Sequence, residues 1–167
     1  MGKNIAILFL LILSACKGVS QEEKEIAKNK NEEKITYPVT KTDAEWKAEL
    51  TDIEYYVLRK AATENSFSSD LLNNKAKGVY VCAGCATPLF KSENKFKSGT
   101  GWPSFDQEIE GNVAYDVDYK IGYARTEEHC ATCGGHLGHV FNDGPRETTG
   151  QRHCINGAAL DFIPTPE

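Results

Sequence analysis

Cys82-Ala-Gly-Cys85 and Cys130-Ala-Thr-Cys133 are two CxxC pairs, separated in the sequence by residues 86–129. Each pair can form a tight turn around one edge of a tetrahedral ion, and glycines at 84, 134 and 135 suit such turns. Four thiolates form the closed coordination shell that is typical of structural zinc. The two pairs therefore predict one structural Zn²⁺ per chain, which joins two distant segments and takes no part in chemistry.

Two other arrangements of these four cysteines fit the spacing. Disulfides form in exported proteins, so either pair could be oxidised. One CxxC could instead be a redox centre, although neither lies in a thioredoxin-like βαβ pattern. Zinc is favoured because two matched pairs are a more specific signal than a single one.

From about residue 67 onward the chain has the pattern of short β-strands. Strands are predicted over residues 78–82, 112–119, 152–155 and 160–163, with Gly and Pro between them. In the second of these runs, alternate side chains point to opposite faces. One face carries Val113, Tyr115, Val117 and Tyr119, and the other carries Ala114, Asp116 and Asp118. The body of the protein is therefore predicted to be mainly β.

Two short helices are predicted before the strands. Thr42-Asp-Ala-Glu45 and Thr51-Asp-Ile-Glu54 both have the capping-box signature of a helix N-terminus. Trp46 and Leu50 follow the first box, and helical spacing continues after the second at Ile53, Tyr56, Val57 and Lys60. We expect Trp46 and Tyr56 to be core residues.

The start of the chain has the features of a bacterial lipoprotein signal. Lys3 precedes an apolar run over residues 5–13, which is shorter than the about 20 residues that cross a bilayer. Leu13-Ser14-Ala15-Cys16 then resembles a lipobox, in which cleavage precedes the cysteine and acyl chains on Cys16 anchor the protein. The alternative is an ordinary secretory signal with an unrelated cysteine.

Three segments are predicted from these patterns. Residues 1–15 form the lipoprotein signal peptide, residues 16–35 a flexible tether, and residues 36–167 the folded domain. The tether is rich in Glu, Lys and Asn, and it has too few apolar residues to offset the entropy of ordering. The formal net charge is −5 without a basic cluster, which argues against nucleic acid as a partner.

Cys154 is the cysteine that remains. The chain has six cysteines, and an odd number after loss of Cys16 to lipidation indicates a free reactive thiol. On a strand, Arg152, Cys154 and Asn156 share one face. A neighbouring cation lowers the pKa of a thiol and increases the nucleophilic thiolate, so Cys154 is the candidate nucleophile. A buried, inert cysteine is the alternative.

Two other segments have the composition of a site. Ser98-Gly-Thr-Gly-Trp-Pro-Ser-Phe105 predicts a shaped loop that presents Trp102, and Gly135-His-Leu-Gly-His-Val-Phe141 places His136 and His139 three residues apart. Taken singly, Trp102 could be a core residue and the histidines could be ordinary hydrogen-bonding groups or metal ligands.

Taken together, these segments resemble the B-type peptide methionine sulfoxide reductases. The resemblance runs from about Trp46 to Pro164. It is carried by Thr63-Glu64, Pro88-Leu-Phe-Lys-Ser92, Gly101-Trp-Pro-Ser-Phe105, His136-Leu-Gly-His-Val-Phe141, Asp143-Gly-Pro145 and Arg152-His-Cys-Ile-Asn156. It implies antiparallel sheets, a four-cysteine zinc site and reduction of the R epimer of peptidyl methionine sulfoxide.

The resemblance also implies roles for individual residues. Cys154 would attack the sulfoxide sulfur and be left as a sulfenic acid, while Trp102 would pack against the ε-methyl group. His136, His139 and Asn156 would orient or protonate the sulfoxide oxygen, and Phe141 and Arg152 would complete the substrate site. The expected partners are oxidised proteins and a thioredoxin-like or small-thiol reductant, and the protein is expected to be a monomer anchored in the cell envelope.

Two positions depart from the family pattern. Thr100 occupies the place where many members have a resolving cysteine, so we expect an external thiol to reduce the sulfenic acid directly. Gly157 stands where serine commonly follows the asparagine. The rival functions are a non-catalytic zinc-ribbon lipoprotein that binds partners, and a metal-delivery lipoprotein that uses His136 and His139.

Overall fold

The computed structural model describes residues 36–166. The predicted signal peptide, the lipidation site Cys16 and the predicted tether lie outside the described residues. Neither of the two helices in the described part of the chain is long and apolar enough to span a membrane.

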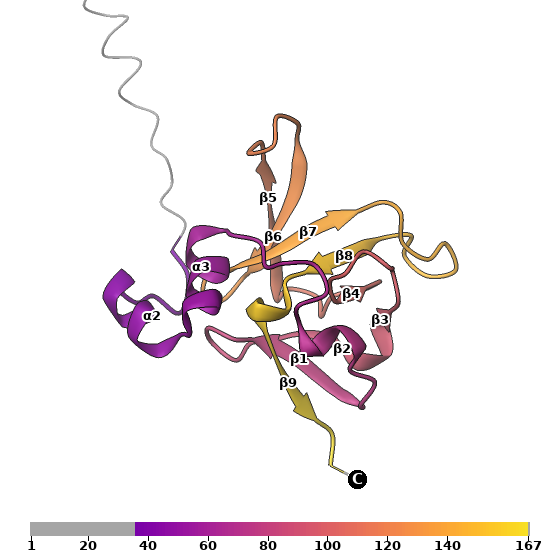
Figure 1. The fold of residues 1–167 in the computed structure, drawn as a ribbon, viewed down its shortest axis with the longest axis horizontal. Coiled ribbons are helices and arrows are strands. Elements are labelled where there is room, and N and C mark those ends of the chain that lie inside the picture. Colours follow the sequence, from indigo (N-terminus) through magenta and orange to yellow (C-terminus); the bar gives the residue numbers. More distant parts are fainter. Residues whose placement is uncertain (1–35, 167) are drawn as a thin grey trace, which may run out of the picture. The chain divides into compact units, whose positions relative to one another are not determined.

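Two antiparallel sheets form the body of the protein (Figure 1). The smaller sheet has the order β2-β1-β9, with β1 at Gly78–Cys82, β2 at Pro88–Lys91 and β9 at Leu160–Pro164. The larger sheet has the order β3-β4-β8-β7-β6-β5. Its strands are β3 (Lys95–Phe96), β4 (Ser104–Phe105), β5 (Val113–Asp118), β6 (Arg125–Cys130), β7 (His136–Phe141) and β8 (Arg152–Ile155). The predicted mainly β fold with antiparallel sheets is confirmed.

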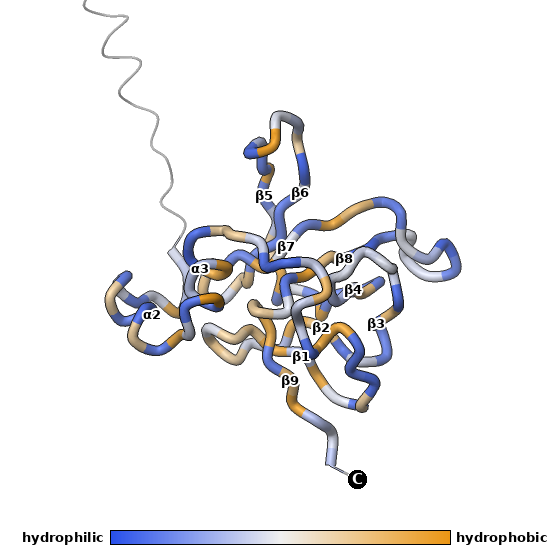
Figure 2. The backbone as a smooth tube through the Cα atoms, viewed as in Figure 1, coloured by the Kyte–Doolittle hydropathy of each residue, from blue (hydrophilic) through white to orange (hydrophobic). Residues whose placement is uncertain are grey.

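Aromatic side chains from both sheets form the core. Phe90 on β2 stacks on Phe105 of β4 with a centroid distance of 4.4 Å, and Tyr80 on β1 meets Phe105 edge-on at 4.9 Å. All three side chains are fully buried. Large aromatic groups contribute most of the apolar area that holds such layers together. Hydrophobic residues accordingly gather around β1 and β9, whereas the β5–β6 hairpin alternates between hydrophilic and hydrophobic residues (Figure 2).

Two capped helices precede the strands, as predicted. Helix α2 spans Asp43–Glu49 and α3 spans Asp52–Lys60, and each begins with a complete capping box, at Thr42 and Thr51. Three short 3₁₀ helices complete the structure: η1 (Asp70–Asn73), η2 (Ser92–Asn94) and η3 (Gly157–Ala159).

The predicted core position of Trp46 is confirmed, but that of Tyr56 is wrong. Trp46 is 2% exposed, whereas Tyr56 is 53% exposed. Helix α3 packs through Leu58, whose side chain lies against the backbone at Gly135. This contact turns Tyr55, Val57 and Leu58 inward, and successive residues differ by about 100° around a helix, so Tyr56 faces solvent.

Strand β5 covers residues 113–118 of the strand predicted over residues 112–119, but its burial does not follow the predicted alternation, because Asp116 on the polar face is exposed and Val113 on the apolar face is buried. Tyr115 and Val117 are about half exposed, while Asp118 is 7% exposed. The β5–β6 hairpin extends beyond the smaller sheet, so its apolar side chains lack a covering layer (Figure 1). Asp118 is buried because it has partners on β6 and β7, which are described below.

Candidate active site and metal centre

The four cysteines of the two CxxC pairs meet at one point. All four sulfur atoms lie within 4.8 Å of one another. Cys82 Sγ is 3.7 Å from Cys133 Sγ, and Cys85 Sγ is 3.5 Å from Cys130 Sγ. In a tetrahedral site with Zn–S bonds of about 2.3 Å, sulfurs lie about 3.8 Å apart. The separations fit that geometry and exceed the roughly 2.05 Å of a disulfide bond.

The cysteine cluster joins the two sheets. Cys82 ends β1 of the smaller sheet, and Cys130 ends β6 of the larger one. Each knuckle closes through a backbone hydrogen bond, from Ala86 N–H to Cys82 O at 2.7 Å and from Gly134 N–H to Cys130 O at 2.8 Å. Gly134 has a positive φ of 67°, as its predicted turn requires, whereas in the first knuckle the left-handed residue is Ala86 and not Gly84.

Cys154 lies on β8, between β4 and β7. Its direct neighbours across the ladders are Ser104 and His139. The side chain is half-buried at a small cavity of about 140 Å³. The cavity is lined by Thr63, Trp102, Arg125, Gly138, His139, Phe141, Cys154 and Asn156. Five of the residues predicted from the sequence therefore meet in one cavity.

Arg152 acts on Cys154 from beside the cavity. Its guanidinium forms two hydrogen bonds to Asp143, at 2.8 and 3.0 Å, and lies 4.5 Å from the centre of the Phe141 ring. Burial raises the pKa of the Cys154 thiol, while the hydrogen bond to Thr100 and the charge of Arg152 lower it. The effect predicted for Arg152 is present, but burial outweighs it, so the pKa of Cys154 is raised overall.

Trp102 and Phe141 form apolar walls of the cavity. The indole Nε1–H of Trp102 donates to the backbone oxygen of Glu64 at 3.3 Å, which holds the ring at the cavity. Phe141 ends β7 and is backed by Arg152. A narrow apolar space beside a thiol suits a small apolar group such as a methyl.

A bulge places the two histidines on one face of the sheet. Residues three apart on a regular strand point to opposite faces. Glu128 pairs with Gly138, but His129 pairs with His136, so β7 contains one extra residue at Leu137. The rings of His136 and His139 consequently lie 5.5 Å apart, edge to face.

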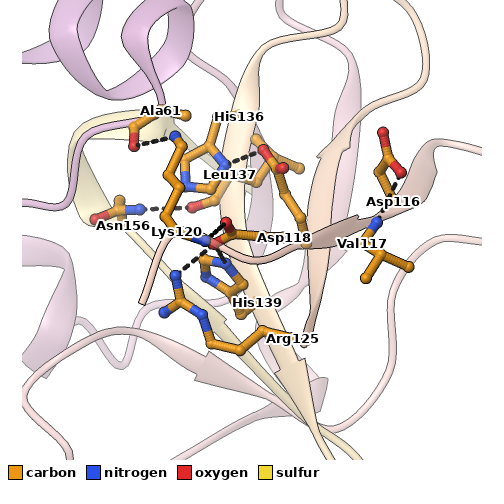
Figure 3. Close-up of polar contacts among 11 residues, drawn as sticks. Ala61, Asp116, Val117, Asp118, Lys120, Arg125, His136, Leu137, His139 and Asn156 are labelled. Carbon is orange, nitrogen blue, oxygen red and sulfur yellow. Dashed lines mark hydrogen bonds and ion pairs between the residues drawn. The ribbon is translucent and has the colours of Figure 1, made fainter. Parts of the chain in front are cut away.

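Each histidine has a carboxylate partner (Figure 3). His136 Nδ1 lies 2.5 Å from Glu127 Oε1, and His139 Nε2 lies 2.9 Å from Asp118 Oδ2. Burial lowers the pKa of both imidazoles, although each carboxylate opposes this effect. Only His139 lines the cavity, and His136 lies behind it as its ring neighbour.

Asn156 is fixed by the backbone on both sides. Its Oδ1 accepts from Glu64 N–H at 3.0 Å, and its Nδ2 donates to Leu137 O at 2.9 Å. The Glu64 carboxylate accepts in turn from the N–H groups of Gly157 and Ala158. The amide thus holds the loop after α3 against the bulged part of β7, and it also borders the cavity.

Some residues of the site were not predicted from the sequence. Thr63, Arg125 and Gly138 line the cavity, and Asp118 and Glu127 support the histidines. Position 138 has no space for a side chain, because a Cβ atom there would lie 2.1 Å from the backbone oxygen of Cys154. Asp118 could have been noticed from its place on the polar face of the strand predicted over residues 112–119.

Fold and site together define a class of protein: a mainly β thiol enzyme with a four-cysteine centre and one further cysteine at a small, partly apolar cavity. Comparison with known proteins gives the family. Residues 50–164 match the family model described as the SelR domain.

Relatives named peptide methionine sulfoxide reductase MsrB support the same assignment. One from Leptospira interrogans is 52% identical over 129 residues, which cover 77% of this chain and 98% of that protein. One from Burkholderia lata is 49% identical over 133 residues, which cover 79% of this chain and 93% of that protein. The chain belongs to the B-type peptide methionine sulfoxide reductases, oxidoreductases that act on the sulfur of oxidised methionine in peptides.

Proposed function

We propose that this enzyme reduces the R epimer of peptidyl methionine sulfoxide at Cys154. The observation that carries the proposal is the position of Cys154 in a small cavity with an apolar side at Trp102 and Phe141 and an imidazole at His139. Sulfoxide reduction requires a nucleophilic sulfur, a proton for the departing oxygen and a space for the ε-methyl group. The cavity contains a group suited to each requirement.

The proposed reaction is balanced by one thiol. The Cys154 sulfur attacks the sulfoxide sulfur, the oxygen is transferred to the cysteine, and the thiol proton ends on that oxygen. Methionine leaves reduced by two electrons, and Cys154 remains as a sulfenic acid. Trp102 and Phe141 hold the methyl group, Arg152 stabilises the thiolate, and His136, His139 and Asn156 orient the oxygen or supply its proton.

Regeneration is proposed to use an external reductant. Thr100 Oγ1 lies 3.8 Å from Cys154 Sγ. The side chain at the place of the family's resolving cysteine is therefore a hydroxyl, which cannot form a disulfide with Cys154. Two equivalents of a thiol, from a thioredoxin-like protein or a small molecule, would convert the sulfenic acid to Cys154 thiol, a disulfide and water. Until then the sulfenic acid is exposed to irreversible over-oxidation.

We further propose that the cysteine cluster binds one structural Zn²⁺. The sulfur separations and the burial of Cys82, Cys130 and Cys133 suit a closed four-thiolate site. With four protein ligands the ion would have no open position for substrate. Its contribution would be to fix β1 of one sheet to β6 of the other.

We also propose a location: a monomer anchored in the bacterial cell envelope through acylated Cys16, facing the periplasm or the outer membrane. The support is the lipobox-like Leu13-Ser14-Ala15-Cys16. Incorporation of a radiolabelled fatty acid into the wild-type protein, and its loss in Cys16→Ser, is the expected result. Equal labelling of both proteins, or of neither, would contradict the anchor.

The catalytic proposal is tested with residues 36–167 and a peptide that contains both sulfoxide epimers, with dithiothreitol as reductant. We expect loss of the R epimer alone, and no turnover by Cys154→Ser. Zinc content and the thermal melting curve of both proteins serve as the folding control. A folded, metal-loaded wild-type protein that leaves both epimers intact would refute the proposal.

A further inference from the structure

The carboxylate of Asp118 contacts the His139 ring and is fixed by three hydrogen-bonding partners. Its Oδ2 lies 2.9 Å from His139 Nε2 and also pairs with Arg125 Nη2, while its Oδ1 accepts from the backbone N–H of Lys120 at 2.7 Å. The Asp118 side chain is 6% exposed. Figure 3 shows the carboxylate between the imidazole of His139 and the guanidinium of Arg125.

The sheet register brings these groups onto one face of the larger sheet, in two neighbouring rows. Asp118 and Arg125 are direct partners on β5 and β6, and His139 and Cys154 are direct partners on β7 and β8. Glu127 pairs with His139 across β6 and β7. Paired residues on neighbouring strands point to the same face, and diagonal neighbours on that face are within reach of long side chains, so Asp118 contacts His139 from the row next to that of His139 and Cys154.

The charges decide which nitrogen of His139 carries the proton. The hydrogen bond from Lys120 N–H, together with those from His139 and Arg125, holds the pKa of Asp118 well below its usual range, so the carboxylate is ionised. An ionised carboxylate can only accept hydrogen bonds. Burial lowers the pKa of His139, and a neutral imidazole must then place its one proton on Nε2, facing Asp118.

We propose that Asp118 is a positioning residue, which fixes the tautomer of His139 so that its Nδ1 accepts the Cys154 thiol proton during attack on the sulfoxide. The imidazolium formed in this step is stabilised by Asp118 and returns the proton to the sulfoxide oxygen. The net reaction is unchanged: thiol and sulfoxide give sulfenic acid and methionine. This inference rests on the proposed function.

Other charged and titratable groups near His139 also affect its pKa. They are Arg125 and Glu127 on β6, His136 on β7 and Cys154 on β8. Arg125 disfavours the imidazolium, and Glu127 favours it. Both remain in place when only Asp118 is changed.

The test compares Asp118→Asn with Asp116→Asn in single turnovers without reductant. Asp116 is the matched control because it lies on the same face of β5 and is exposed. Among residues 36–166 its carboxylate accepts only from the neighbouring Val117 N–H, at 2.7 Å (Figure 3). We expect Asp118→Asn to lower the single-turnover rate of methionine formation about 100-fold or more, with the substrate concentration that gives half the maximal rate unchanged within about twofold. Asp118→Glu should recover part of the rate, and Asp116→Asn should behave as wild type.

The pH profile separates positioning from a purely structural role. The rate should rise with pH as His139 loses its proton and becomes a base. Without the Asp118 carboxylate the imidazolium is less stable, so its pKa falls and the acidic limb moves to lower pH. A change in packing alone would lower the rate at every pH and leave the limb in place.

The tautomer can be read directly from the nitrogen chemical shifts of His139 in the resting wild-type protein. We expect the proton on Nε2, and a proton on Nδ1 would overturn the inference even if Asp118→Asn failed to fold. A wild-type rate within threefold in a folded Asp118→Asn protein, with an unmoved acidic limb, would overturn it as well. If the wild-type protein itself fails to reduce the R epimer, the proposed function is what fails.

Discussion

At the scale of single residues, the reactivity of Cys154 depends on opposing effects. Its burial at the cavity favours the neutral thiol, and the charge of Arg152 favours the thiolate. Because burial prevails, the pKa of Cys154 lies above that of an ordinary cysteine. A raised pKa shifts the balance between thiol and thiolate toward the thiol, which is the less readily oxidised form.

Removal of the Arg152 charge should raise the pKa of Cys154 further. We expect Arg152→Met to move the midpoint of Cys154 alkylation by iodoacetamide to higher pH, because the thiolate loses its neighbouring cation. Mass spectrometry of the Cys154 peptide across a pH series measures the midpoint. Arg146→Met, which removes an exposed arginine, is the control. A midpoint that stays in place in Arg152→Met would mean that this cation does not act on the thiol.

Thr100 is positioned to act as a resolving residue if it carries a thiol. The 3.8 Å contact between Thr100 Oγ1 and Cys154 Sγ places a Thr100→Cys sulfur beside the sulfenic acid. We expect one equivalent of substrate to give an intramolecular disulfide in this variant, detected as a linked peptide by mass spectrometry. The wild-type protein should give only a sulfenic acid, which dimedone traps. Dimedone labelling of Thr100→Cys at the wild-type level would contradict the expectation.

At the scale of elements, the packing of η3 against η1 explains the unusual Gly157. A Cβ atom at position 157 would lie 1.9 Å from Ser69 Oγ and 2.3 Å from Ser69 Cβ. Ser69 caps η1 through its hydroxyl, which accepts from Leu71 N–H at 3.1 Å. The serine that is common in the family at this place therefore has no room beside Ser69, and the departure has a local steric cause.

This steric conflict should appear in a double-mutant cycle. We expect Gly157→Ser to lower the free energy of unfolding by about 1–3 kcal/mol through overpacking. Ser69→Gly removes the opposing side chain, so the double variant should recover most of that loss. Urea denaturation of the four proteins measures the coupling. Losses that simply add would show that the two positions do not compete for space.

The bulge in β7 is a second feature decided at this scale. Strand periodicity alone would turn His136 and His139 to opposite faces. The extra residue at Leu137 aligns them, and Gly138 allows β7 to approach the backbone of Cys154. A short sequence motif can therefore identify both histidines as site residues, but their common orientation follows from the pairing of β7 with β6.

For the molecule as a whole, the cysteine cluster brings together the ends of strands from the two sheets. Cys82 and Cys130 end strands of different sheets, and the chain between them contains β2 to β5. A metal at this point would stabilise the relative placement of the sheets, and with it the core around Phe90 and Phe105.

Metal removal should therefore unfold the enzyme, not merely inactivate it. We expect Cys82→Ser to lose its zinc and several kcal/mol of stability, since the binding free energy of structural zinc contributes directly to folding. Zinc content by a colorimetric chelator and thermal melting monitored by circular dichroism measure the two effects. Cys154→Ser should retain one zinc and the wild-type melting curve. A stable, metal-free Cys82→Ser protein would argue against the structural role.

The local features of this protein can be predicted from its amino-acid sequence. Both helices are marked by capping boxes at Thr42 and Thr51, and strands β1, β8 and β9 are predicted nearly to their ends, because caps and strand patterns depend on neighbouring residues. Motifs also identified the cysteine cluster, Cys154 and the family. These signals depend on residue type and spacing, which the chain carries before it folds.

How these segments meet depends on contacts between residues that are distant in the sequence. Four features of the site and its surroundings depend on such contacts. They are the exposure of Tyr56, the common orientation of His136 and His139, the raised pKa of Cys154 and the contact of Asp118 with His139. Burial, electrostatics and strand register are properties of the assembled layers. A local pattern specifies which residues a site contains, whereas packing across the sheets sets their orientation and charge.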